Sequence, residues 1–131
     1  MNWNKTFIEI SELVSKHSKC IRNKVGAILV KDNRIISIGY NGTPHGYDNN
    51  CEIGDVTVKE VIHAESNAIT KCAKSVESTK DSILYCTTSP CFDCVKLIIQ
   101  SGIKEIYFKE KYRDVSGLEL LTKLNIKYHE I

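Results

Sequence analysis

The sequence predicts an α/β domain with three layers, in which helices flank both faces of a five-stranded mixed sheet. From residue 63 onward, helix-type and strand-type segments alternate three times, an order that implies parallel strands joined by right-handed crossovers. Before residue 63, two β-rich runs flank a tight turn and predict an antiparallel hairpin in the same sheet. A chain of 131 residues fits one domain, so we expect residues 1–131 to form a single unit.

The N-terminal part is expected to supply the first helix and the hairpin. The helix is expected over about Asn4–His17, because apolar side chains recur there every three to four residues. These side chains are Trp3, Phe7, Ile10 and Val14. The β-rich runs are Val25–Val30 and Arg34–Tyr40, and Asp32 and Asn33 between them are typical of a tight turn.

Residues 41–60 are rich in Gly, Asn and Asp and predict a long loop. Loops of this length inside a compact domain are usually functional.

The C-terminal half is expected to alternate between helices and strands. Its expected elements are a helix over His63–Lys74, a strand over Ile83–Thr87, a helix from Ser89 to Gly102, a strand over Glu105–Phe108, a helix from Ser116 that carries Leu118, Leu121 and Leu124, and a strand over Ile126–His129. Ser89 is expected to cap its helix, with Pro90 at the first helical position. Ser116 and Glu119 have the spacing of a capping box.

Charge and hydropathy exclude several function classes. The net charge is +2 and the two signs are interspersed, so the sequence offers no basic track for nucleic acid. The longest uncharged apolar stretches, Val25–Val30 and Leu97–Ile103, are far too short to span a membrane. The N-terminus does not resemble a secretory signal, so we expect a cytoplasmic protein. In that compartment the six cysteines are expected to be metal ligands or buried thiols rather than disulfides.

The motif that carries the chemistry combines His63-Ala64-Glu65 with Pro90-Cys91-Phe92-Asp93-Cys94. Cys91 and Cys94 lie three residues apart, so both thiols face the same side of a helix start. One imidazole and two thiolates favour zinc over magnesium or manganese. Three protein ligands leave the fourth tetrahedral position open, which is typical of a catalytic zinc site.

Glu65 is the carboxylate of this motif that need not bind the metal. It lies two residues from His63 and is expected to carry protons between an acidified water and the substrate. Hydrolytic deamination of an amidine-like ring uses such a pair, and this His-x-Glu and Pro-Cys-x-x-Cys pattern is a known signature of zinc-dependent base deaminases.

Other interpretations of these residues stay open at this point. A Cys-x-x-Cys pair alone also fits a redox pair or half of a structural zinc site, whose fourth ligand would be Cys72 or Cys86. We expect those two cysteines to be buried in the core instead. Outside enzymes, the alternative is a zinc-stabilised binding module without turnover.

Over most of its length the chain resembles the deoxycytidylate (dCMP) deaminase family of the cytidine deaminase superfamily. The similar runs are Val25-Gly26-Ala27, Gly39-Tyr40-Asn41-Gly42-Thr43-Pro44, Ile62 to Ile69, and Thr88 to Cys94. The Gly-Tyr-Asn-Gly run discriminates among superfamily members. The resemblance implies a cytidine deaminase-like fold and hydrolysis of dCMP to dUMP and ammonia, which supplies dUMP for dTMP synthesis.

The resemblance also implies substrate-binding residues. Asn41 would hold the sugar hydroxyl, Tyr112 would pack on the pyrimidine, and Arg113 would bind the 5′-phosphate, a role that suits a planar guanidinium. Further substrate-binding candidates are Arg22, Lys24 and Ala64.

Regulation and assembly are implied by the family alone. Many members are activated by dCTP and inhibited by dTTP with Mg²⁺, and their effector site borders the turn that matches Gly39, Tyr40, Asn41 and Gly42. Members commonly form homo-oligomers, and a hexamer is favoured here. Some relatives carry a second, structural zinc; Cys20 and Cys51, with His17 and His45 nearby, match part of such a set.

Three rival deaminase classes share parts of the pattern. Free cytidine deaminases have Cys in place of His63 and lack a helix between the last two strands, whereas residues 109–125 here predict one. The tRNA adenosine deaminases share both motifs, but RNA binding predicts a more basic chain. Guanine deaminase is a weaker alternative.

Overall fold

A computed structural model describes residues 2–131, which form four helices and seven strands. In chain order these are α1 (Trp3–Ser15), β1 (Gly26–Lys31), β2 (Arg34–Tyr40), β3 (Glu52–Ile53), β4 (Val56–Thr57), α2 (Ala64–Ala73), β5 (Ile83–Thr88), α3 (Phe92–Gln100), β6 (Glu105–Glu110), α4 (Ser116–Lys123) and β7 (Lys127–Glu130). Within these residues, no helix has the length and apolar character needed to cross a bilayer.

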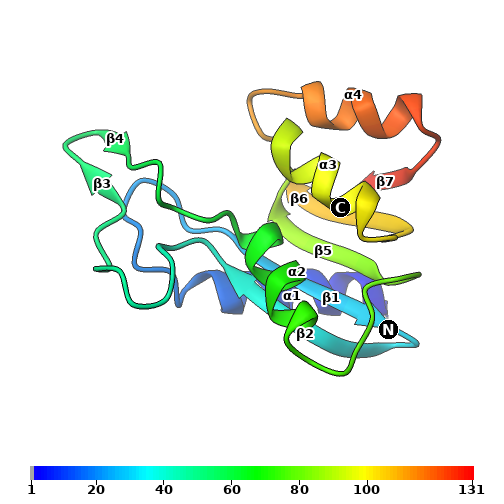
Figure 1. Ribbon diagram of the computed structural model, residues 1–131. Helices are drawn as coiled ribbons and strands as arrows, with labels where there is room; N and C mark the ends of the chain where they lie inside the picture. Colours follow the sequence, from blue (N-terminus) through cyan, green and yellow to red (C-terminus); the bar gives the residue numbers. More distant parts are fainter. Residues whose placement is uncertain (1) are drawn as a thin grey trace.

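Five strands form one mixed sheet in the order β2-β1-β5-β6-β7. The β2–β1 and β1–β5 pairs are antiparallel, whereas β5–β6 and β6–β7 are parallel. Figure 1 shows α2, α3 and α4 on one side of this sheet and α1 on the other. The predicted three-layer fold is confirmed, and α4 is the helix expected between the last two strands.

Strand β1, between β2 and β5, is buried on both faces, because its side chains alternate between the two sides of the sheet and helices cover both sides. Ile28 and Val30 pack with Phe7 beneath α1. Ala27 and Leu29 belong to the larger core on the opposite face, beneath α2 and α3. This strand therefore contributes side chains to both apolar layers.

The first helix and the turn that follows β1 were predicted with different accuracy. Residues Asp32 and Asn33 have φ values of 51° and 61°, as expected for a tight hairpin turn. Helix α1 buries most of the predicted face, since Phe7 and Val14 are buried and Ile10 packs against the same core. The buried face also includes Ile8 and Ser11, and Trp3 is the predicted residue that lies outside it. Trp3 is 54% exposed, and its ring stacks on Phe7 at a centroid distance of 5.7 Å.

Both helix caps predicted in the C-terminal half are wrong. Helix α3 begins after Cys91, and the Ser89 hydroxyl instead accepts the N–H of Tyr112 at 2.7 Å. Helix α4 has no capping box; the Asp114 carboxylate accepts the N–H of Ser116 at 3.0 Å. In both places a side-chain oxygen accepts a backbone N–H, and which side chain does so depends on the path of a loop. Sequence spacing alone does not predict that path.

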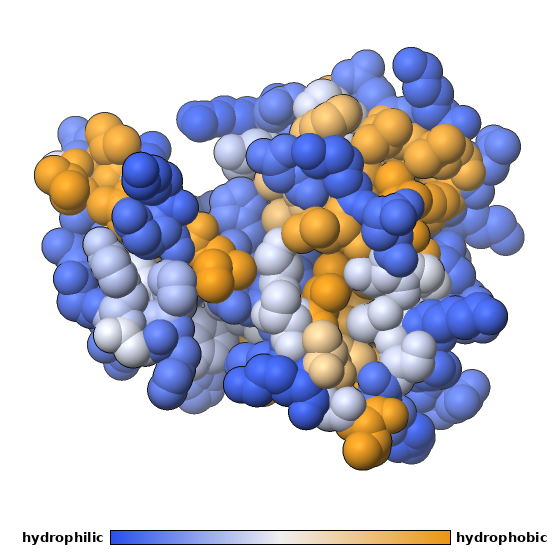
Figure 2. Space-filling view, viewed as in Figure 1, coloured by the Kyte–Doolittle hydropathy of each residue, from blue (hydrophilic) through white to orange (hydrophobic). Residues whose placement is uncertain are grey.

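The long loop over residues 41–60 contains the small antiparallel hairpin β3–β4, which projects away from the main sheet (Figure 1). Figure 2 shows apolar surface at its tip, where Ile53 and Val56 are 74% and 66% exposed. The same view shows the surface hollowed between this hairpin and the body of the molecule.

Candidate active site

His63 lies at the N-terminal end of α2, where the chain changes from extended to helical backbone. It is the N-cap residue of α2, but its side chain makes no capping hydrogen bond, so the imidazole is left to face the neighbouring helix. Gly42 and Ile62 exchange two backbone hydrogen bonds, at 3.1 and 2.7 Å, immediately before it. This bridge ties the loop after β2 to the start of α2.

The close packing of α2 on the sheet depends on Gly39 in β2. A Cβ atom at Gly39 would lie 2.4 Å from the Ala64 carbonyl oxygen and 2.5 Å from the Ala68 nitrogen. A methyl group cannot fit at those distances, so the glycine lets the first turn of α2 lie directly on β2. The position of His63 follows from this contact.

Cys91 and Cys94 come from the N-terminal end of α3, which meets the start of α2. Cys91 is the N-cap residue and Cys94 lies in the first turn. Helix N-termini favour thiolates because unpaired N–H groups and the helix dipole are directed there. Gly117 allows α4 to approach this segment, since a Cβ there would lie 2.6 Å from the Pro90 carbonyl oxygen.

The donor atoms of His63, Cys91 and Cys94 have the spacing that a zinc ion requires. The His63 Nδ1 atom is 3.4 Å from Cys91 Sγ and 3.5 Å from Cys94 Sγ. All three donor atoms lie within 4.8 Å of one another. Usual Zn–N and Zn–S bond lengths give a nitrogen–sulfur edge of about 3.5 Å in a tetrahedral site. The residues therefore fit zinc, and together they leave one ligand position open.

The two thiols differ in acidity because they share a hydrogen bond. Hydrogen bonds with Cys94 and with His63 lower the pKa of Cys91 to about 4. The same bond to Cys91, together with burial, raises the pKa of Cys94. Hydrogen bonding to Cys91 also raises the pKa of His63. The lowered pKa of Cys91 favours its thiolate, which is the form of cysteine that binds a metal ion.

Glu65 lies in the first turn of α2 with a side chain that is 4% exposed. Burial raises the pKa of its carboxyl to about 7, and the nearby His63 opposes part of that shift. A carboxyl group with a pKa near neutrality can both accept and donate a proton. The raised pKa suits the role of proton carrier that the sequence motif predicts for Glu65.

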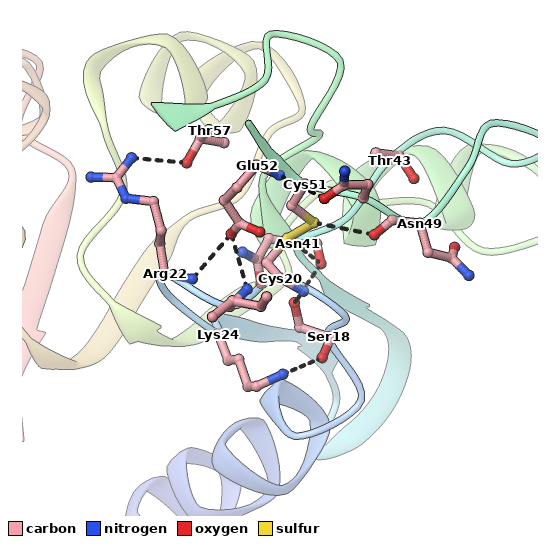
Figure 3. The surroundings of a disulfide bond; sticks show 12 residues. Ser18, Cys20, Arg22, Lys24, Asn41, Thr43, Asn49, Cys51, Glu52 and Thr57 are labelled. Atoms are coloured by element: carbon pink, nitrogen blue, oxygen red, sulfur yellow. Dashed lines mark hydrogen bonds between the residues drawn. A yellow bond between two sulfur atoms is a disulfide. The ribbon is translucent and has the colours of Figure 1, made fainter. Parts of the chain in front are cut away.

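The helix ends open into a cavity of about 560 Å³, a size typical of small-ligand sites. Its lining includes these residues from the sequence prediction: His63, Ala64, Glu65, Cys91, Asn41, Arg22, Tyr112 and Arg113. Lys24 is not among them, because its ammonium donates to the Ser18 carbonyl at 2.6 Å (Figure 3). The structure thus brings eight of the ten predicted catalytic, metal and substrate residues to the lining of one cavity. Besides Lys24, the exception is Cys94, which is buried beside His63.

Asn41 is held by the backbone on both sides of its amide. Its Oδ1 accepts the N–H of Val25 and its Nδ2 donates to the Asn23 carbonyl, each at 2.8 Å. One N–H and one oxygen lone pair are left over for a ligand. The side chain is therefore fixed in direction before any ligand binds.

Sequence reasoning missed several residues of this cavity. They are Asn23, Val25, Glu52, Thr57, Val61, Thr88, Ser89, Glu110 and Lys111. Glu52 and Thr57 lie in the loop that was expected to be functional, but no local pattern indicated which of its side chains would face Arg22. Ser89 and Glu110 lie where β5 and β6 end, a position that the strand assignment could have flagged.

A second cavity of about 330 Å³ lies on the other side of the Gly39–Gly42 turn. Tyr40, Asn41 and Gly42 line it, whereas Gly39 is packed against α2. The Lys71 ammonium lies 5.2 Å from the centre of the Tyr40 ring and adds a positive charge to this cavity.

The expectation of reduced thiols is wrong for one pair, because Cys20 and Cys51 form a disulfide (Figure 3). Their sulfur atoms are therefore not available as thiolate ligands of a second zinc. The other four cysteines are free. Cys72 and Cys86 are buried, as expected.

Comparison with known proteins assigns this arrangement to a family. The family model for the cytidine and deoxycytidylate deaminase zinc-binding region matches residues 1–110. The chain is 41% identical over 117 residues to ComE operon protein 2 of Bacillus subtilis, covering 86% of this chain and 62% of that protein. It is 37% identical over 123 residues to the deoxycytidylate deaminase of Schizosaccharomyces pombe, covering 85% of this chain and 38% of that protein. The chain thus spans less than two thirds of the length of both.

A solved structure extends the likeness to almost the whole chain. The dCMP deaminase of cyanophage S-TIM5, crystallised with dCMP and dUMP, superimposes with a TM-score of 0.94 at 43% identity. The match covers 97% of this chain and 95% of that one.

Proposed function

The chain belongs to the cytidine and deoxycytidylate deaminase family, and on this premise we propose that it hydrolyses dCMP to dUMP and ammonia, acting in the cytoplasm to supply dUMP for dTMP synthesis. One observation carries the proposal. The His63 and Cys91 donors, the buried Glu65 carboxyl and two arginines, Arg22 and Arg113, line one cavity of about 560 Å³, and the third donor, Cys94, lies next to His63 and Cys91. A zinc-binding pocket with two arginines at the same cavity suits a cytosine nucleotide, which carries a negative phosphate, better than a neutral nucleoside.

His63, Cys91 and Cys94 are the residues that would hold zinc. A zinc ion bound there would supply an acidified water as the nucleophile. Glu65 would take one proton of that water and deliver it to ring nitrogen N3 of cytosine, and it would then carry the second proton of the same water to the departing amine. The pKa of Glu65, raised by burial to about 7, suits both transfers.

The remaining cavity residues would bind and orient the nucleotide. The fixed amide of Asn41 would hold the sugar hydroxyl, and Ala64 would contact the base from the floor of the cavity. Tyr112 would pack on the pyrimidine, while Arg113, whose guanidinium carbon is 5.9 Å from the centre of the Tyr112 ring, would reach the phosphate.

We extend the proposal to regulation and assembly. The second cavity, with Tyr40, Asn41, Gly42 and Lys71, would take dCTP as an activator and dTTP with Mg²⁺ as an inhibitor, in a homo-oligomer, with a hexamer favoured. Its support is the positive charge beside a turn shared by both cavities, since Asn41 lines each of them. Assays with and without both effectors, combined with mass determination by light scattering, test this extension.

A substrate panel tests the main proposal. The purified protein is assayed with dCMP, dCTP, CMP, deoxycytidine and an adenosine-containing RNA hairpin, and loss of absorbance is followed. We expect dCMP to be consumed with the largest kcat/KM. Turnover of the RNA alone would instead assign the chain to tRNA adenosine deamination, and absence of turnover with zinc bound would favour a binding module.

A further inference from the structure

We propose that the β3–β4 hairpin is a positioning device for Arg22, in which Glu52 and Thr57 set this arginine for the phosphate of the substrate. The inference rests on the proposed function, because it assumes that the ligand of the cavity carries a phosphate. It assigns roles to two residues that lie about thirty positions from Arg22 in the sequence and that no sequence motif marked.

Glu52 holds the backbone at Arg22. Its Oε2 atom accepts the N–H groups of Ile21 and Arg22 at 2.9 and 3.0 Å (Figure 3). The Glu52 side chain is buried, and its Oε1 finds no hydrogen-bond partner within residues 2–131. A buried carboxylate that depends on two backbone donors holds its partner segment firmly, because moving it would leave further unpaired polar atoms.

Thr57 holds the other end of the same arginine. Its hydroxyl accepts a hydrogen bond from Arg22 Nη1 at 3.1 Å. Glu52 and Thr57 are directly opposite each other across the hairpin, so both side chains extend from the same face. Glu52 and Thr57 together therefore hold both the backbone of Arg22 and the end of its long, flexible side chain.

The chemistry of the two contacts leaves the positive charge of Arg22 available. Glu52 accepts the backbone amide of Arg22, and the hydrogen bond to the guanidinium goes to the neutral hydroxyl of Thr57. A carboxylate paired with the guanidinium would compete with a phosphate, whereas a hydroxyl orients it without neutralising it. The remaining N–H groups of Arg22 can then bind phosphate oxygens in the same cavity.

The base of the β3–β4 hairpin is anchored. A two-stranded hairpin of this size is at best marginally stable alone, so it needs such an anchor. Cys51 precedes Glu52 and is joined to Cys20, two residues before Arg22. The N–H of Val58 donates to the Cys51 carbonyl at 2.7 Å and closes the hairpin. The disulfide thus links the chain next to Glu52 covalently to the chain two residues before Arg22.

Steady-state kinetics of Thr57 variants with dCMP and deoxycytidine test the inference. Thr57→Val keeps the shape of the side chain but removes the acceptor, and we expect KM for dCMP to rise roughly three- to tenfold with little change in kcat. Deoxycytidine, which has no phosphate, should be processed as before. Thr57→Ser restores the hydroxyl and should restore KM. In an Arg22→Ala background, Thr57→Val should have no further effect.

The inference is overturned if Thr57→Val weakens both substrates equally, if Thr57→Ser fails to rescue, or if the Arg22 and Thr57 effects multiply. Calorimetric titration with dUMP separates this result from the proposed reaction. Should no cytosine nucleotide be deaminated, the proposed function fails. A Thr57→Val protein that binds dUMP more weakly than wild type, with Thr57→Ser normal, would still support the positioning role.

Discussion

The two ends of the cavity are built in different ways. At the metal end, His63, Glu65, Cys91 and Cys94 all lie at helix N-termini that pack on the main sheet. At the other end, Arg22 lies in a loop and is held by a small projecting hairpin with an exposed apolar tip. The groups proposed to react are therefore held by helices on the sheet core, whereas Arg22, proposed to bind the phosphate, is held by a few loop contacts.

Removal of the metal should cause the largest loss of dCMP turnover. A small loss would show that the reaction does not depend on the metal end of the cavity. Dialysis against a zinc chelator should abolish dCMP turnover, because three of the four zinc ligand positions are filled by protein donors and the fourth would carry the nucleophilic water. Activity should return on addition of one equivalent of zinc. Circular dichroism during the same titration serves as the control for unfolding.

Glu65→Gln should produce the next largest loss. The variant keeps the size of the side chain but removes the proton carrier, so kcat should fall by roughly 10²- to 10⁴-fold. Metal content, measured by elemental analysis, should equal that of the wild type. Retained activity in a zinc-loaded Glu65→Gln protein would show that another group moves the proton.

Arg113→Ala should affect substrates unequally, in contrast to changes at the metal end. Loss of a charged hydrogen-bond donor should lower kcat/KM for dCMP roughly 10- to 100-fold and leave deoxycytidine nearly unchanged. Arg34→Ala is a matched control, because Arg34 lies on the surface and pairs with Glu77 at 3.6 Å. An equal loss for nucleoside and nucleotide would remove Arg113 from phosphate binding.

Reduction of the Cys20–Cys51 disulfide should have the smallest effect on turnover of the changes considered. We expect KM for dCMP to change less than with Thr57→Val, because the Glu52 hydrogen bonds to Ile21 and Arg22 remain. Stability should fall by about 3–4 kcal/mol, the loop-closure contribution for residues 31 apart. Thiol titration before and after reduction, with thermal unfolding of Cys51→Ser, measures both. A rise in KM for dCMP larger than that of Thr57→Val, in protein that is still folded, would show that the disulfide shapes the cavity directly.

Much of the metal end was predictable because its signals are local. The Cys91–Cys94 spacing places both thiols on one side of a helix start, and the combination of these two thiols with His63 and Glu65 predicted one zinc site. The loop details were not predictable in this way. The predicted Ser89 cap and the predicted Ser116–Glu119 capping box both depended on where neighbouring loops run.

The sequence by itself determined the order of the elements, the family and the donor set for zinc, since each follows from residues close together along the chain. Only the tertiary structure decided that Lys24 faces Ser18, that Cys20 bonds to Cys51, and that Glu52 and Thr57 reach across 30 and 35 positions to hold Arg22. The physical reason is that such contacts depend on how a long loop closes upon the folded sheet, and loop closure leaves no periodic trace in the amino-acid sequence.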